Sequence, residues 1–198
     1  MKDYHRSILT FLAFSGLVLT GCAGDREAAW NAVTVEALNA SQSAQHATAI
    51  AARDAMFANL MTTLSSELAA QGPSGAIAVC KDKAPEVAKA TGERFGVEIG
   101  RTSWKLRNPE NAAPSWAEAL LAKRPQEPRL SASPEGHLGV TLPIRLQSQC
   151  LSCHGPADSI PGDVREALAT LYPEDRATGF REGELRGWFW VEVPPPAR

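Results

Sequence analysis

Five consecutive residues, Cys150-Leu151-Ser152-Cys153-His154, constrain this chain more than any other feature of its sequence. The spacing C-x-x-C-H is the attachment site of a c-type haem. Two thiols at this spacing can add to the two vinyl groups of one porphyrin. The histidine that follows then lies beside the ring, where its imidazole can bind the iron. The motif therefore predicts one covalently held haem c per chain, with His154 as an iron ligand.

The size and charge of the chain limit it to one domain and exclude one class of partner. Its 198 residues, 44% of them hydrophobic, suffice for one core and hardly for two. The formal net charge is −2, so there is no basic field to attract nucleic acid.

We see no Ser/His/Asp arrangement, paired carboxylates or phosphate-binding loop. His137 with Arg145 could form a peroxidase pair, but peroxide would need an open position on the iron, which a second protein ligand would fill. We therefore do not expect an enzyme.

The first residues are typical of a bacterial lipoprotein signal. Basic residues near the start precede an apolar run at residues 8–19, which is too short for a comfortable membrane span. Small residues then come directly before Cys22 and resemble a lipobox, which predicts a signal peptide at residues 1–21 and lipidation of Cys22. An ordinary signal peptide is the alternative. In bacterial lipoproteins an Asp directly after the lipidated cysteine favours retention at the inner membrane, and this chain has Ala23 there instead. We therefore expect a cell-envelope protein anchored by lipid, facing the periplasm, at the outer membrane rather than the inner one.

The chain has four cysteines, and this pattern predicts a use for three of them. Cys22 would carry the lipid, and Cys150 and Cys153 the two thioether bonds. Cys80 is left over, and an unpaired cysteine in an oxidising compartment needs a reason. It could be a buried inert side chain, an intermolecular disulfide partner, or the second axial ligand of the iron. A zinc site made by the motif and Cys80 is an alternative to haem.

Helical patterns come first and short strands later, which predicts an α+β fold. Residues 27–70 contain no Pro or Gly and repeat apolar residues at helical spacing, so they predict a long helix that Gly72 and Pro73 end, either continuous or broken near residues 39–41. Further expected elements are helices at 76–80, 85–92, 115–122 (opened by a capping box at Ser115) and 163–171, strands at 95–103 and 137–146, a Pro-rich connector at 124–134, and a hairpin at 179–193.

Several short blocks of the sequence together resemble one known family. The blocks lie at residues 75–80, 84–85, 100–103, 105–111, 150–155, 172–180 and 183–187. They are similar to the bacterial c-type haem domain that occurs alone in lipoproteins and cyanobacterial proteins. That domain also forms the extracytoplasmic sensor region of histidine kinases and chemoreceptors. The resemblance covers about residues 45–193, and the combination is specific although each block alone is weak.

The resemblance implies a fold and a ligand set. We expect a PAS-like α+β haem domain at residues 45–198, with a long N-terminal helix, a small antiparallel sheet and a c-type haem. Residues 22–44 would be the lipidated N-terminus and the start of the long helix. The iron would be held by His154 on one side and Cys80 on the other. Rival second ligands are Met56, Met61, His46 and His137.

Four basic residues are candidates to pair with the haem propionates, because guanidinium and ammonium groups bind carboxylates. They are Arg101, Lys105, Arg107 and Arg186. The alternative for each is ordinary surface charge. Trp104, Trp116, Trp188 and Trp190 either wall the haem or fill the core.

The function that these patterns favour is redox or small-ligand sensing. Thiolate ligation favours ferric over ferrous iron, so we expect a low reduction potential. Release of Cys80 on reduction would open a site for nitric oxide or carbon monoxide. No kinase or methyl-accepting region follows Arg198, so we expect a separate redox or signalling protein as partner. The alternatives are a periplasmic electron-transfer cytochrome and, less favoured, a weak peroxidase-like haem enzyme.

Overall fold

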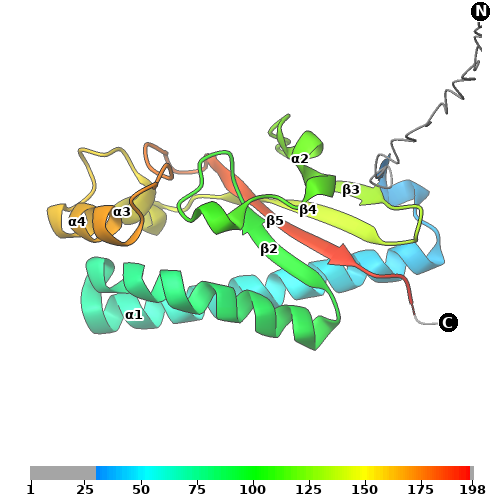
Figure 1. The fold of residues 1–198 in the computed structure, drawn as a ribbon, viewed down its shortest axis with the longest axis horizontal. Helices are drawn as coiled ribbons and strands as arrows, with labels where there is room; N and C mark the ends of the chain where they lie inside the picture. Colours follow the sequence, from blue (N-terminus) through cyan, green and yellow to red (C-terminus); the bar gives the residue numbers. More distant parts are fainter. Residues whose placement is uncertain (1–29, 197–198) are drawn as a thin grey trace, which may run out of the picture.

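The computed structural model describes residues 30–196 and shows a helical hairpin packed along one face of a small sheet (Figure 1). The sheet has five strands in the order β1-β3-β4-β5-β2, and every neighbouring pair is antiparallel. The strands are β1 (Asn31–Val33), β2 (Glu98–Thr102), β3 (Arg129–Ala132), β4 (Leu138–Arg145) and β5 (Leu185–Val193). The predicted α+β class is confirmed. The expected export segment and Cys22 lie outside the described residues.

The hairpin is made by α1 (Ala40–Phe95), which one glycine divides into two arms. Gly72 has φ 70° and ψ −178°, a conformation that an L side chain rarely adopts, and Pro73 follows it. The predicted break at this point is confirmed. The first arm (residues 40–71) and the second arm (residues 73–95) lie side by side (Figure 1). The remaining helices are α2 (Ser115–Leu121), α3 (Leu151–His154) and α4 (Gly162–Leu171), with 3-10 turns η1 (Val35–Ala37), η2 (Pro109–Asn111) and η3 (Ser148–Cys150).

The two faces of the sheet have different partners, because side chains alternate along a strand. Val140 and Leu142 of β4 and Val191 of β5 pack against Ala52 and Met56 of the first arm in the main core. On the opposite face, Trp188 of β5 and Leu185 pack with α2. The sheet thus separates a large core against α1 from a smaller one under α2. Of the residues described, no helix is long and apolar enough to cross a membrane.

Several expected element boundaries are wrong, and local hydrogen bonds give the reasons. The first helix does not begin at residue 27 but at Ala40, where the sequence offered a break as the alternative, because Asn39 caps it: its side chain accepts from the Gln42 N–H at 2.9 Å, and the Gln42 side chain accepts from the Asn39 N–H at 3.1 Å. The second arm does not restart at Pro85 or stop at Gly92; it runs through both and ends at Gly96, which is left-handed with φ 65°.

The predictions for the later elements also need correction. Ser115 makes no capping bond, because Pro114 occupies the N-cap position and has no polar side chain to offer. The expected connector at 124–134 contains β3, which pairs with both β1 and β4. The expected hairpin at 179–193 contributes one strand, β5, because that strand pairs with β4 and β2 instead of folding back on itself.

Gln45 of α1 joins the hairpin to the chain's last strand. Its buried Nε2 donates to the carbonyls of Gly136 at 2.9 Å, Val193 at 3.1 Å and Pro194 at 3.0 Å. We predict that Gln45→Ala lowers the free energy of unfolding by about 2 kcal/mol, because it leaves carbonyls near the core without a donor. Chemical denaturation measures this. Gln71→Ala, which removes only an exposed contact to Glu67, is the matched control. Equal stabilities of the two variants would contradict the role given to Gln45.

Candidate functional site

The motif residues and Cys80 line one cavity of about 320 Å³. Its walls come from both arms of α1, from β2 and from the segment that carries the motif. The motif contributes Cys150, Cys153 and His154 to the cavity wall. The second arm of α1 contributes Cys80, which lies far from the motif in the sequence. The structure therefore brings together the four residues that sequence analysis singled out as cofactor ligands.

The first arm of α1 makes the cavity apolar. Apart from Thr63, its contribution consists of apolar residues that recur at helical spacing along one side of the arm: Met56, Phe57, Leu60, Met61, Leu64 and Leu68. Phe57 is 43% exposed although it is a large apolar residue, so this wall reaches the protein surface. An apolar cavity with a few polar groups is typical of a site for a flat organic cofactor.

The motif forms a tight helical turn that directs its three functional side chains to one side. Cys150 precedes α3, and Cys153 and His154 follow it by three and four residues, the spacing at which helical side chains share a face. Gly155 ends the turn, and its N–H donates to the Leu151 carbonyl at 2.9 Å. A Cβ on Gly155 would lie 2.6 Å from that carbonyl oxygen, so this position needs glycine.

One hydrogen bond fixes which nitrogen of His154 can bind a metal. Nδ1 lies 2.7 Å from the Ala177 carbonyl oxygen, which can only accept, so Nδ1 carries the proton. Nε2 then keeps its lone pair. Burial, helped by the positive charges of Arg107 and Arg186, holds the pKa of His154 well below its ordinary value. The imidazole is therefore neutral, which is the form that ligates metals.

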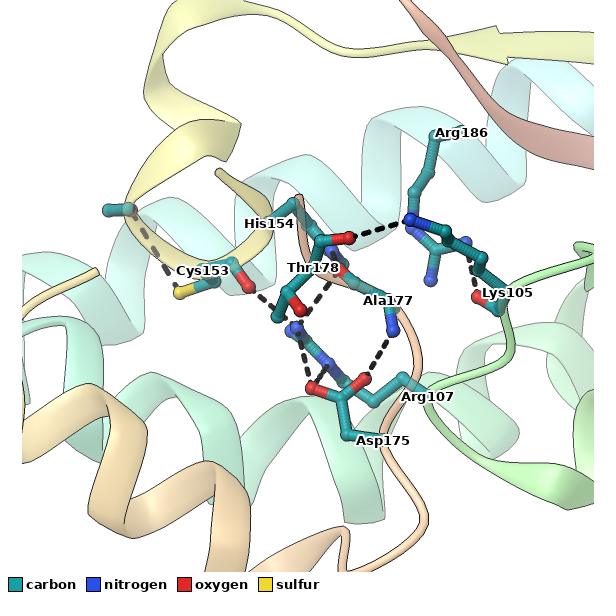
Figure 2. Close-up of polar contacts among 9 residues, drawn as sticks. Lys105, Arg107, Cys153, His154, Asp175, Ala177, Thr178 and Arg186 are labelled. Atoms are coloured by element: carbon teal, nitrogen blue, oxygen red, sulfur yellow. Dashed lines mark hydrogen bonds and ion pairs between the residues drawn. The ribbon is translucent and has the colours of Figure 1, made fainter. Parts of the chain in front are cut away.

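A short segment, residues 175–180, crosses the motif, and we refer to it as the strap. Its main chain donates twice to the motif: from Phe180 N to the His154 carbonyl at 3.0 Å, and from Gly179 N to the Gly155 carbonyl at 2.8 Å. Ala177 of the strap carries the carbonyl that faces His154. Figure 2 shows His154 and Ala177 together with the side chains that surround their contact.

Arg107 lies between Asp175 of the strap and the motif (Figure 2). Arg107 Nη2 donates to the Cys153 carbonyl at 2.6 Å and lies 3.1 Å from Asp175 Oδ2. Arg107 Nε donates to the same carboxylate oxygen at 3.1 Å. The other oxygen of Asp175 accepts from the Ala177 N–H at 2.7 Å. Sequence analysis missed Asp175 and the strap, although block 172–180 contains both.

The four basic candidates have different surroundings. Arg101, Arg107 and Arg186 line the cavity, whereas Lys105 does not: its Nζ donates to the Thr178 carbonyl at 3.0 Å and lies 4.9 Å from the centre of the Phe180 ring. Arg186 Nη1 donates to the Lys105 carbonyl at 3.0 Å. Arg107 is engaged as described above. Within residues 30–196, Arg101 has no hydrogen bond or ion pair to another side chain or carbonyl, so its guanidinium is the one most available to a bound carboxylate.

Cys80 has a polar neighbourhood as well as access to the cavity. Cys80 is exposed and lines the cavity. The surrounding protein partly buries the thiol, which raises its pKa, whereas the positive charge of Arg101 acts to lower that pKa. Burial, and then the nearby Cys80 sulfur, raise the pKa of Tyr172 to about 12. Arg101 thus provides a positive charge that favours the thiolate form a metal requires.

The rival ligands divide into two pairs. Met56 and Met61 line the cavity, so either could reach a cofactor there. His46 and His137 are not part of its wall, and His137 Nδ1 lies 2.9 Å from Glu192 Oε1 at the far end of β5. The tryptophans considered above are likewise absent from the wall; Trp188 is buried and Trp116 stacks on Trp30.

The zinc interpretation finds less support than the haem interpretation in this arrangement. Among residues 30–196, no three or more His, Cys, Asp or Glu side chains gather closely enough to hold a metal ion. The four candidate donors instead line a large, mainly apolar space together with several arginines. This donor set, with two thiols for attachment and a neutral imidazole, fits a porphyrin.

Fold and site together define an α+β domain in which a C-x-x-C-H motif faces an apolar cavity formed by a helical hairpin. The chain belongs to the Tll0287-like family, whose model matches residues 29–194. Among solved structures it is similar to that of the cyanobacterial heme-protein Tll0287, at 24% sequence identity over 81% of this chain and 99% of that one. The TM-score is 0.57, which shows a shared fold. No curated protein matches the chain. The family resemblance inferred from the sequence is confirmed.

Proposed function

We propose that this chain is a lipid-anchored c-type haem protein of the bacterial cell envelope that senses redox state or a small ligand. The observation that carries the proposal is the shared cavity. His154 has a neutral imidazole whose Nε2 is unprotonated, and His154 lines the cavity. Cys80, which comes from a distant part of the sequence, lines the same cavity. The related structure of Tll0287 is described as a heme-protein, which supports the same cofactor here.

Each part of the cavity has a role in holding the haem. Cys150 and Cys153 would form the thioether bonds, and His154 and Cys80 would ligate the iron. Arg101 would pair with a propionate, because its guanidinium has no competing partner among the described residues. The apolar side chains of the first arm would exclude water from the ring. When bound, the haem supplies a one-electron redox centre and a metal that can take a small ligand.

A single preparation tests both the cofactor and its ligation. The full chain is expressed in a host that attaches haem to exported proteins, and the membrane and soluble fractions are compared. We expect membrane-bound protein, an intact mass increased by one haem that organic extraction does not remove, and a low-spin ferric spectrum. Recovery of protein without covalent haem would overturn the proposal. Soluble protein alone would overturn only the anchor at Cys22, which rests on sequence.

A periplasmic electron carrier is the second candidate, and the exposure of Phe57 favours it. An electron carrier needs a haem edge at the surface, and Phe57 shows that the cavity wall reaches solvent. Carbon monoxide and nitric oxide distinguish the two functions. A sensor is expected to bind them in the ferrous state, with a clear change in the optical spectrum. An unchanged six-coordinate spectrum under carbon monoxide would favour the carrier.

A further inference from the structure

We propose that Asp175 and Arg107 are positioning residues for His154, and that they set how strongly this imidazole donates to iron. The inference rests on the proposed function, because it concerns the haem ligand. It assigns Arg107 to the protein's own framework, whereas the sequence alone suggested that it could pair with a propionate. It also gives a role to Asp175, which no motif had singled out.

The contacts form a closed circuit around the histidine. Asp175 Oδ1 accepts from the N–H of Ala177, and the carbonyl of that same residue accepts from His154 Nδ1. Asp175 Oδ2 is held by Arg107, whose Nη2 also donates to the Cys153 carbonyl, one residue before His154. Arg107 therefore joins the strap to the motif, and Asp175 fixes the residue that orients the imidazole (Figure 2).

The side chains of this circuit are largely buried, so the loss of one of them should disturb the others. The side chains of Arg107 and Asp175 are 14% and 10% exposed, so little water is available to replace a lost partner. Removing one member of a buried pair leaves the other charge uncompensated. Main-chain hydrogen bonds to the motif, and one from Arg176 N to the Leu106 carbonyl at 2.9 Å, would hold the strap near its place. The direction of the Ala177 carbonyl depends in addition on Asp175, which accepts from the N–H of that residue, and on Arg107 Nη2, which lies 3.5 Å from the carbonyl oxygen.

The direction of that carbonyl matters for iron chemistry. A hydrogen bond from Nδ1–H makes the imidazole more basic and holds its plane, and such partners of metal ligands commonly change affinity tenfold or more when removed. A more basic imidazole favours ferric iron over ferrous. Weakening the bond is therefore expected to shift the ferric-to-ferrous affinity ratio by up to about tenfold, which equals about 59 mV for a one-electron couple.

Two substitutions break the circuit in different ways, and a third serves as control. Asp175→Asn removes the charge that holds Arg107. Arg107→Lys keeps its charge but loses the fork that reaches both Asp175 and the Cys153 carbonyl. Glu174→Gln removes the same charge as Asp175→Asn at the neighbouring exposed position, which makes no hydrogen bond or ion pair with Arg107, Asp175 or His154. All three are made in the full haem-loaded chain.

The readouts are the spin-resonance spectrum of the ferric iron, the reduction potential and the thermal midpoint. We expect both Asp175→Asn and Arg107→Lys to broaden or shift the low-spin signal and to raise the potential, while Glu174→Gln matches wild type. We also expect the double variant to shift the potential by less than the sum of the single variants, because both act on one circuit.

The result that overturns the inference is a lower thermal midpoint with wild-type spectrum and potential, which is what a merely structural pair would give. Equal shifts in Glu174→Gln would also overturn it, since they would indicate a general charge effect. If Asp175→Asn does not accumulate, Arg107→Lys decides the question by the same criteria. Wild-type protein that carries no haem would instead refute the proposed function, so the two failures are distinguishable.

Discussion

Alanine at position 80 is expected to remove one iron ligand, change the ferric spectrum and raise the reduction potential. Cys80 lines the cavity that the motif faces, and a thiolate there would donate electron density and a negative charge to the iron. Both effects favour ferric iron, so their loss should weaken that preference by at least about tenfold, or about 59 mV. Optical and spin-resonance spectra of wild type and Cys80→Ala, with a potentiometric titration of each, measure this.

Two methionines provide the matched controls for this experiment. Met56 and Met61 line the same cavity and are the rival ligands that the structure leaves within reach. Met56→Leu and Met61→Leu keep the apolar volume and remove only the sulfur, so we expect wild-type spectra from both. If Cys80→Ala leaves the spectrum unchanged and one methionine variant alters it, the second ligand is methionine and the potential should be high rather than low.

Cys80 also shows how much of the site the sequence could predict. The motif follows from five letters, and the leftover cysteine follows from counting thiols. Their meeting in one cavity depends on the break at Gly72, which folds the second arm back along the first. Gly72-Pro73 is a local signal, so this step was predictable. The direction of the second arm, and hence the position of Cys80, could not be predicted from the sequence and is known only from the structure.

The strap could not be predicted, because its role consists of contacts between segments far apart in the sequence. Arg107 reaches Asp175 across 68 positions, and His154 reaches Ala177 across 23. No spacing rule connects them. The same limit applies to the basic candidates: the sequence marks each as a charge, but only the fold shows that Lys105 and Arg107 already have protein partners while Arg101 faces the cavity.

Strand β3 was missed for a different physical reason. Residues 124–134 are rich in proline, and sequence patterns treat proline as a connector because it cannot donate to a sheet. In the structure, the prolines lie outside the four residues of β3, which are held by pairing with both neighbours. Strands this short depend on their partners more than on their own propensity.

Replacing Cys150 and Cys153 together by alanine is expected to abolish covalent haem while leaving the fold formed. Both thiols line the cavity, and neither belongs to the main core between the first arm and the sheet; Cys153 packs only at the edge of a smaller cluster around Ile160 and Val164. The double variant should therefore lose the mass of one haem and the absorbance that survives organic extraction. Each single variant should keep one thioether bond, with a shifted absorption band in pyridine.

Two further variants separate attachment from ligation and from local structure. Cys80→Ala should keep the full haem mass, because Cys80 would bind iron and not the porphyrin. Ser152→Ala lies between the two cysteines and removes the hydrogen bond from its hydroxyl to the Gln149 carbonyl and the 3.9 Å contact with the Cys153 sulfur, but it leaves both thiols in place, so it should also keep the haem. The zinc interpretation predicts a different pattern: one equivalent of zinc and no haem mass in wild type, and loss of zinc in the Cys80→Ala variant as well as in the double variant. Intact mass and metal content of these proteins therefore decide whether the five-residue motif holds a porphyrin or an ion.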